Sequence, residues 1–122
     1  MIITAYHGTE KIFDIFDYRF VGTASGVKSS YFFFTSEIEN ALTFGDIVLK
    51  CNLIIDRPYI VKDGLQGKSP RMWADEISIM NFENDTDYDG VILLNVIDSY
   101  GFVTSDIYVP FDLDNIEICG IL

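Results

Sequence analysis

The sequence contains one histidine and two cysteines in 122 residues. A single imidazole excludes a metal hydrolase that needs several histidine ligands. Cys51 and Cys119 lie in separate apolar segments, and neither belongs to a Cys-x-x-Cys pair. We therefore expect two buried, reduced thiols in a cytoplasmic protein, with no metal centre and no disulfide scaffold.

Long apolar runs and targeting signals are also lacking. No apolar run approaches the ~20 residues that a membrane helix needs. The N-terminal segment MIITAYHGTEK has no basic region followed by a long apolar stretch, so we expect no signal peptide. The sequence therefore predicts no membrane association.

Basic side chains are scarce. Eight Lys and Arg stand against 19 Asp and Glu, which gives a net charge of -11. Binding to DNA, RNA or an anionic membrane needs clustered cations, so the composition argues against all three. An acidic surface can serve solubility alone. It can also complement a basic partner, such as a protein that binds nucleic acid.

Several common motifs are missing or incomplete. The sequence has no P-loop, no Gly-x-Gly-x-x-Gly after a strand, and no Gly-x-Ser-x-Gly elbow. Asp85–Gly90 matches the first half of an EF-hand loop, but the twelfth position, which should be an acid, is Val96. We interpret this segment as an acidic turn before a strand.

The apolar pattern predicts one α+β domain over residues 1–122. Apolar residues make up 49% of the chain, including ten Phe and seven Tyr, so disorder is excluded. Ser36 as N-cap and Glu39 at the third position predict a short helix that ends at Gly45. Ser69-Pro70 predicts the start of a second helix, with apolar residues at helical spacing over 72–80. We expect loops at residues 22–26 and 95–105, and strands at residues 2–6, 31–34, 47–55, 59–61, 91–94, 107–111 and 116–121.

Four segments together resemble one family. They are Tyr6-His7-Gly8-Thr9, Phe32–Ser36 with the helix that follows, Tyr88–Ile92, and Asp106–Asp112 with Ile116 behind it. Their order resembles the ADP-ribosyltransferase superfamily, especially the small transferase domains of phage-encoded polyvalent proteins. Poly(ADP-ribose) polymerases, which have the diphtheria-toxin-like arrangement of histidine, tyrosine and glutamate (H-Y-E), are more distant relatives. The resemblance implies two small antiparallel sheets, packed with a few short helices around a cleft that takes NAD as a substrate.

The resemblance also implies roles for single residues. The histidine at the end of the first strand, His7 here, binds a ribose hydroxyl. Gly8 presents backbone groups to the nicotinamide amide, with Thr9 beside it. Phe33 and Phe44 match two aromatic positions where the family usually has tyrosine. Stacking on nicotinamide survives that change, because it needs only a flat π face. Taken alone, the histidine also fits a structural role at the edge of a core, and the two phenylalanines fit ordinary packing.

The family's catalytic glutamate has no direct match. Counting back from Asp112 places it at Ile107, which cannot act as an acid. Asp106 is the first candidate, although it would need a bulge or register shift to turn inward. Asp98, in the preceding loop, is the second candidate. Asn95 is expected to bind the substrate or the backbone by hydrogen bonds.

These observations predict an NAD-dependent mono-ADP-ribosyltransferase of phage or mobile-element type. Its acceptor would be a host protein, from a defence or transcription system, in the host cytoplasm, and we expect a monomer. One alternative is a non-enzymatic acidic inhibitor on the same fold, which masks a basic, nucleic-acid-binding host protein. Another is an α+β domain of different function.

Overall fold

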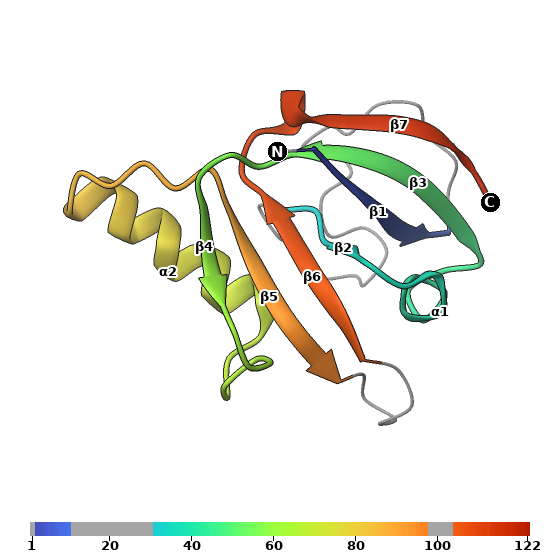
Figure 1. Ribbon diagram of the computed structural model, residues 1–122, viewed down its shortest axis with the longest axis horizontal. Helices are drawn as coiled ribbons and strands as arrows, with labels where there is room; N and C mark the ends of the chain where they lie inside the picture. The colour runs from blue at the N-terminus through green and yellow to red at the C-terminus, as the bar shows by residue number, and fades with distance from the viewer. Residues whose placement is uncertain (1, 11–30, 98–103) are drawn as a thin grey trace.

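The computed structural model describes residues 2–10, 31–97 and 104–122, which form an α+β fold around one seven-stranded sheet (Figure 1). The strands are β1 (Ile2–Thr9), β2 (Phe34–Thr35), β3 (Ile47–Ile54), β4 (Pro58–Val61), β5 (Gly90–Ile97), β6 (Thr104–Pro110) and β7 (Ile116–Ile121). The helices are α1 (Ile38–Ala41), α2 (Pro70–Glu83) and the 3-10 turn η2 (Leu113–Asn115).

The sheet has the strand order β4-β5-β6-β2-β1-β3-β7. The sequence predicted two small antiparallel sheets, and the structure corrects both parts of that prediction. The strands form one sheet because β2 pairs with β1 on one side and with β6 on the other. The pair β4 and β5 is parallel, because α2 carries the chain back from the end of β4 to the start of β5.

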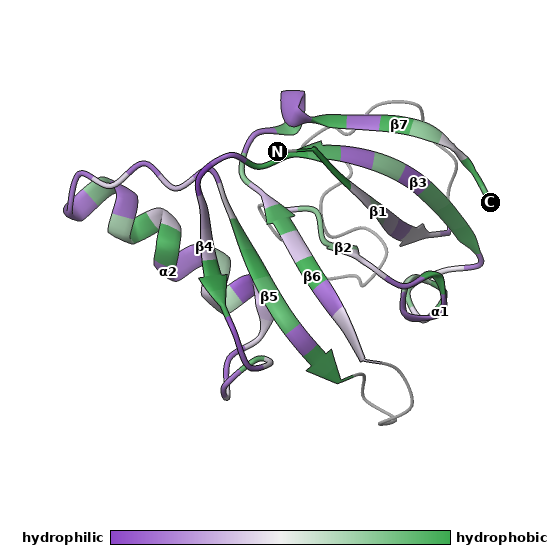
Figure 2. Cartoon of the chain, in the orientation of Figure 1, coloured by the Kyte–Doolittle hydropathy of each residue, from purple (hydrophilic) through white to green (hydrophobic). Residues whose placement is uncertain are grey.

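Two apolar cores lie on the sheet, and neighbouring residues of β5 contribute to different ones. Ile92 packs into the first core, whereas Val91 and Leu93 pack into the second, as the alternation of a strand requires. Apolar residues follow β5 along most of its length (green in Figure 2). The first core consists of Ala5, Phe32, Phe34, Leu49, Cys51, Leu53, Ile55 and Ile92. The second consists of Val61, Trp73, Ala74, Ile77, Val91, Leu93, Val96 and Val109.

The helix predicted after Ser69 is confirmed. The Ser69 side chain accepts a hydrogen bond from the Met72 amide at 3.2 Å, and Pro70 occupies the first turn. The inner side of α2 buries Trp73 and Ala74 against β5 and β6. The Trp73 indole also donates a hydrogen bond to the Leu65 carbonyl at 2.8 Å. The helix therefore covers the second core.

The first helix differs from its prediction. Ser36 was expected to cap it, but the N-cap is Glu37, which makes no side-chain capping bond. The Ser36 hydroxyl instead accepts a hydrogen bond from the Asp106 amide at 2.8 Å. The Ser36 amide donates to the Asp106 carbonyl at 3.0 Å. The side chain is thus used to attach β2 to β6, and α1 ends at Ala41, short of Gly45.

The strands β3, β4 and β7 confirm the sequence prediction to within a residue, and the others differ in length. The strand β1 continues to Thr9, and β5 continues to Ile97. The expected loop over 95–105 is therefore shortened at both ends. The aromatic run 31–34 contributes only Phe34 to a strand. The predicted loop over 22–26 lies outside the described residues.

The two cysteines do not share one environment. Cys51 is buried in the first core, and burial, reinforced by the charge of Cys119, raises the pKa of its thiol to about 12. Cys119 is exposed, so the prediction that both are buried is wrong for this residue. On β7 the inward positions belong to Ile116 and Ile118, so the intervening residues point away from the core.

Candidate functional site

His7 lies on β1 with its ring against two buried aromatic rings. The ring centroids of Phe32 and Phe34 are 5.8 and 5.3 Å from that of the imidazole. The Nδ1 atom is 2.8 Å from the Phe33 carbonyl oxygen, which can only accept, so Nδ1 carries the hydrogen. Burial lowers the pKa of His7 below its ordinary value of 6.5, although the bond to Phe33 works in the opposite direction. The ring is therefore neutral near pH 7, and Nε2 is a hydrogen-bond acceptor.

Gly8 is required by close packing at the end of β1. A Cβ added there would lie 1.8 Å from the Ala41 carbonyl oxygen, at the end of α1. A Cβ added at Gly45 would lie 2.3 Å from the backbone carbonyl of Thr9. These two glycines let α1 and its following turn lie directly on β1, and Thr9 is buried there. Gly8 thus has a packing role that holds whether or not its backbone meets a ligand.

The predicted aromatic positions do not lie with the His7 ring. Phe33 is half-buried and packs against the second core, beneath α2. Phe44 follows α1, 58% exposed. The Phe44 Cβ is 3.3 Å from the position that a Cβ on Gly8 would take. Side chains of neighbouring strand residues point to opposite faces, so Phe44 lies on the face of β1 opposite to the His7 ring. The rings beside the imidazole are instead Phe32 and Phe34. Strand alternation within the aromatic run was the signal that could have indicated them.

Asp106 lies on the same side of the sheet as His7. Phe34, which contacts the imidazole, is directly opposite Tyr108 on β6. Asp106 is two residues before Tyr108, so their side chains share a face. The pKa of Tyr108 is raised, first by burial and then by the charge of Asp106 and a hydrogen bond with its side chain. The sequence predicted that Asp106 would need a bulge or register shift to turn inward. In the structure Ile107 packs into the second core, so Asp106 faces the side of His7 without a bulge in β6.

The bulge is on β5 instead. The register between β5 and β6 shifts between Leu93 and Val96, and Asn95 has φ of +59°. The Asn95 amide donates a hydrogen bond to Asp106 Oδ1 at 3.1 Å, and its side-chain nitrogen donates to the Lys62 carbonyl at 3.3 Å. The structure therefore brings Asn95 and Asp106 together. The other candidate acid, Asp98, lies outside the described residues.

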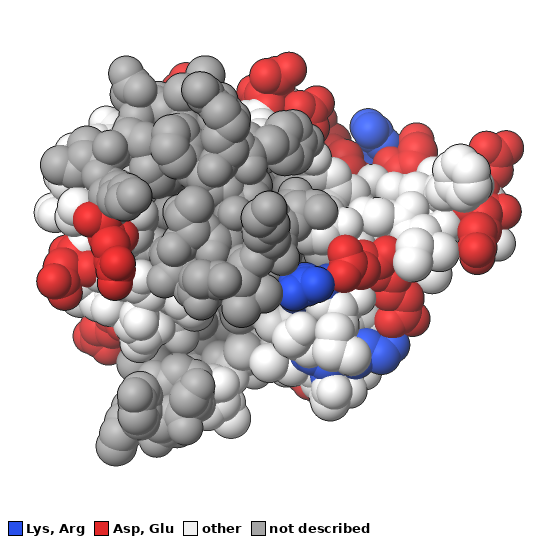
Figure 3. Space-filling model, turned by 180° about the vertical axis from the view of Figure 1, so that it is seen from behind, with Lys and Arg blue, Asp and Glu red and all other residues white. Residues whose placement is uncertain are grey.

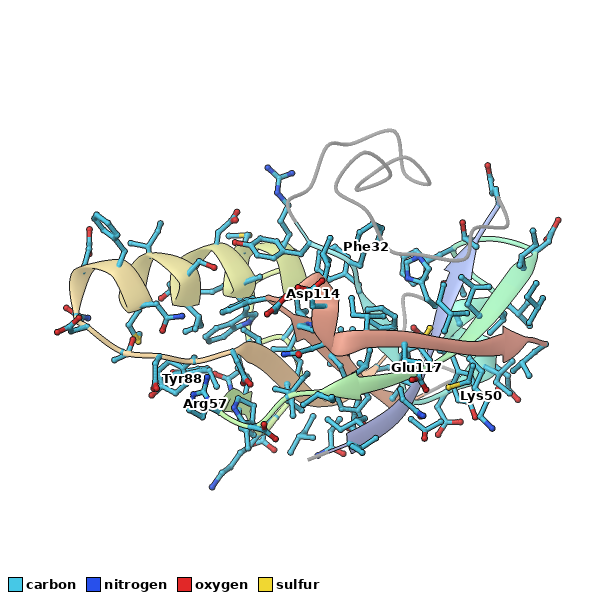
Figure 4. All side chains as sticks on the ribbon, turned by 90° about the horizontal axis from the view of Figure 1, so that it is seen from above. Phe32, Lys50, Arg57, Tyr88, Asp114 and Glu117 are labelled. Carbon is cyan, nitrogen blue, oxygen red and sulfur yellow. The ribbon has the colours of Figure 1, made fainter. Side chains whose placement is uncertain are left out.

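The acidic segment before β5 holds the backbone of a neighbouring turn. Asp89 accepts hydrogen bonds from the amides of Asp56 and Arg57 at 2.8 and 2.7 Å. Arg57 also pairs with Asp87 at 3.2 Å, and it lies next to Tyr88 below α2 (Figure 4). The acidic segment lies directly before β5, as predicted, but residues 85–89 form an irregular stretch and not a turn. Among the described residues, no group of three His, Cys, Asp or Glu side chains could hold a metal ion.

No protein-family model matches the chain, and no curated protein or solved structure is significantly similar to it. Within the described part of the chain, no helix combines the length and the apolar character needed to cross a membrane. The chemistry of the site therefore has to be inferred from its own geometry.

Proposed function

We propose that the protein is an NAD-dependent ADP-ribosyltransferase that uses His7 to bind NAD and Asp106 to promote transfer. One observation carries the proposal: a neutral imidazole and a carboxylate lie on the same face of three adjacent strands, β1, β2 and β6. Two strand spacings of about 4.8 Å, and an offset of two residues along β6 at about 3.4 Å each, set a backbone separation of roughly 12 Å. This spacing suits one extended ligand that meets both groups.

The two groups match two different parts of the nicotinamide riboside. The His7 Nε2 atom accepts a hydrogen bond, and a ribose hydroxyl donates one. Asp106 supplies a negative charge for the positive charge that develops on the ribose as nicotinamide leaves. The Asn95 amide already donates to one Asp106 oxygen, which fixes the carboxylate against β5.

Transfer of ADP-ribose from NAD to the acceptor needs no reagent besides these two molecules. The bond between the anomeric carbon and the nicotinamide nitrogen breaks, and its electron pair leaves with nicotinamide, which departs neutral. A nucleophilic side chain of the acceptor supplies an electron pair to the anomeric carbon and loses a proton to water or to Asp106. Since Asp106 acts on charge that is absent from bound NAD, it should contribute mainly to the transition state.

Other parts of the proposal rest on the sequence resemblance. These are the ADP-ribosyltransferase-like cleft, the roles of Gly8, Phe33 and Phe44, and a host protein of defence or transcription as the acceptor. Phe33 packs beneath α2, and Phe44 lies on the other side of β1 from the imidazole. We therefore base the test on His7 and Asp106.

The test compares NAD binding with nicotinamide release in two variants. Calorimetry should show that His7→Ala weakens NAD binding by ~1–3 kcal/mol, the cost of leaving a buried polar group unpaired. Asp106→Asn should bind NAD nearly as the wild type does, yet release nicotinamide at least ~100-fold more slowly.

Wild-type protein that does not bind NAD, or equal binding by a folded His7→Ala variant, would reject the proposal. An unchanged rate of nicotinamide release in Asp106→Asn would show that Asp106 does not promote transfer, and would leave Asp98 or Asn95 as the residue that does. Those positions are then tested by Asp98→Asn and Asn95→Ala.

A second candidate function is masking of a basic, nucleic-acid-binding host protein without catalysis. The net charge of -11 favours it, as does the lack of the family's glutamate, whose position holds Ile107. Such binding needs no NAD and leaves no covalent product.

A further inference from the structure

The outer side of α2 carries an apolar stripe that no described part of the chain covers. Met72, Ile79 and Phe82 are 53%, 55% and 90% exposed. They are spaced by seven and three residues, so they lie along one side of the helix. The opposite side already buries Trp73 and Ile77 in the second core. Packing of α2 on the sheet therefore does not account for these exposed side chains.

Acidic side chains near the start of α2 have basic partners, whereas those at its end have none in the described part of the chain. Lys68 pairs with Glu76 at 2.5 Å, and Arg71 lies 3.9 Å from Asp75 one turn further along the helix. These pairs occupy the first half of α2.

At the other end of the helix, Glu83 follows Phe82 directly and Asp85 lies two residues further along, and both are exposed. Neither has an ion-pair partner among the described residues, and the last turn of α2 contains no basic residue. Acidic groups at a helix C-terminus face the negative end of the helix dipole. A cation from outside would relieve both the repulsion and the lack of a partner.

We propose that the C-terminal half of α2 binds a basic, amphipathic segment of a partner protein. Apolar side chains of that segment would cover Ile79 and Phe82, and its Lys or Arg side chains would meet Glu83 and Asp85. Seen from behind, the end of the molecule formed by α2 shows uncharged side chains bordered by acidic ones (Figure 3). An exposed apolar patch with a charged rim is typical of a protein-binding surface.

Charge complementarity selects this occupant over others. A second copy of the chain would bring the same acidic rim and a net charge of -11 to the contact. An anionic membrane or a nucleic acid would also be repelled by the rim. The inference goes beyond the proposed function, because the surface contains neither His7 nor Asp106 and its binding requires no NAD.

The test uses fluorescence anisotropy with a labelled peptide of Leu and Lys at helical spacing, about 15 residues long to form roughly four turns. A Leu/Glu peptide of the same pattern and a Gly/Lys peptide serve as controls for charge and for apolar contact. The protein variants are Phe82→Ser and Glu83→Gln. Leu122→Ser is the matched control, because Leu122 is 59% exposed and lies at the end of the chain far from α2.

The Leu/Lys peptide should bind the wild type and the Leu122→Ser variant alike, and bind less tightly as salt rises. Phe82→Ser should weaken binding by about tenfold or more, the loss typical of a central apolar contact. Glu83→Gln should weaken it by roughly threefold, as expected for an exposed charge pair. His7→Ala should bind the peptide like the wild type, which separates this result from the outcome at the NAD site.

Four results would overturn the inference. They are no binding of the Leu/Lys peptide, equal binding of the Leu/Glu peptide, equal affinities for Phe82→Ser and Leu122→Ser, and a wild-type dimer in sedimentation that Phe82→Ser dissociates. A fifth contrary result is binding to vesicles that contain phosphatidylserine, lost in Phe82→Ser, which would show that the surface binds a membrane and not a protein segment. The substitutions Phe82→Ser, Glu83→Gln and Leu122→Ser are all at exposed positions, and circular dichroism verifies that each variant is folded.

Discussion

At the scale of single residues, His7 connects the candidate site to the stability of the fold. Its imidazole packs between two buried phenylalanines and donates Nδ1–H to a backbone carbonyl. Both features favour one orientation of the ring, and burial, which outweighs the bond to Phe33, favours its neutral form. In the proposed function, NAD meets an imidazole whose orientation and tautomer are already set by the bond that Nδ1 makes.

The lowered pKa of His7 gives a testable dependence of stability on pH. In the unfolded chain the imidazole takes up a proton near pH 6.5, whereas in the folded protein it does so only at lower pH. Between these two values the unfolded state binds more protons, so the free energy of unfolding decreases as the pH falls. Above about pH 7.5 neither state is protonated, and the effect is absent.

Urea unfolding at about pH 7.5 and about pH 5.5 measures this effect, since most carboxylates stay ionised at both. We expect His7→Gln to lose less free energy of unfolding over that interval than the wild type. Equal losses in the two proteins would show that the ring is not kept neutral by burial.

The residue scale also shows what could be predicted from the sequence. His7 was identifiable because it is the only histidine and follows an apolar segment. Its contacts were not, because they depend on Phe32 and Phe34 facing the first core while Phe33 faces the second. Likewise, the face of Asp106 depends on the pairing of Phe34 with Tyr108, which sets the residues of β6 that share a face with the imidazole, and nothing in the sequence of β6 indicates it.

At the scale of secondary-structure elements, the contact between α1 and β1 depends on the absence of side chains. The helix is only four residues long and has no side-chain cap, so it gains little stability from its own sequence. It is held by packing, with the Ala41 carbonyl against Gly8.

Gly8→Ala should therefore destabilise the protein. The new Cβ would meet a backbone oxygen, which no side-chain rotation can move, so α1 must shift on β1. We expect a loss of about 1–3 kcal/mol in the free energy of unfolding, the usual cost of overpacking.

Gly120→Ala is the matched control, because it places the same methyl group on β7 with nothing within 4 Å. It should be neutral or slightly stabilising, since glycine is unfavourable within a strand. Equal destabilisation by both substitutions in urea unfolding would contradict the packing explanation.

Elements with strong local signals were predictable, and those defined by distant partners were not. The start of α2 is set by Ser69 and Pro70, which act within one turn. The strand β3 is rich in apolar residues and is interrupted only by Lys50 and Asn52. In contrast, Ser36 has the residue type of a helix cap but bonds to a strand 70 residues away. Local propensity cannot indicate such a choice, because the competing partner is distant in sequence.

At the scale of the whole molecule, the acidic charge gives a way to tell masking from catalysis, because the two depend differently on salt. A masking protein holds its partner through screened charge pairs, so its binding should weaken steeply as salt rises. A transferase leaves a covalent ADP-ribose that persists after the protein is removed. The two functions therefore differ in both NAD requirement and reversibility.

The experiment incubates a candidate basic host protein with this protein, with and without NAD, and assays it before and after a high-salt wash. We expect inhibition that requires NAD and survives the wash, with an added ADP-ribose in the mass spectrum of the host protein. Inhibition that forms without NAD and disappears on washing would reject the transferase and support masking.

The fold class was predictable at this scale, but the joining of all seven strands into one sheet was not. Short apolar runs separated by turns indicated an α+β protein, and the structure has that composition. Whether seven strands form one sheet or two depends on the two-residue strand β2, which pairs with β1 through Thr35 and with β6 through Phe34 and Thr35. So short a strand leaves no recognisable period in the sequence.

This two-residue strand also has a consequence for the order of folding. The hairpin of β5 and β6, and the unit of β4, α2 and β5, close over short stretches of chain. Joining β2 to β6 brings Phe34 next to Tyr108, 74 positions later in the sequence. Closing so large a loop for so few hydrogen bonds gives little return until both flanking parts exist. The pairing of β3 with β7 spans a similar length of chain, since Leu53 lies opposite Ile116. We therefore expect the part formed by β4, α2, β5 and β6 to fold first, and the junctions at β2 and β7 to close later.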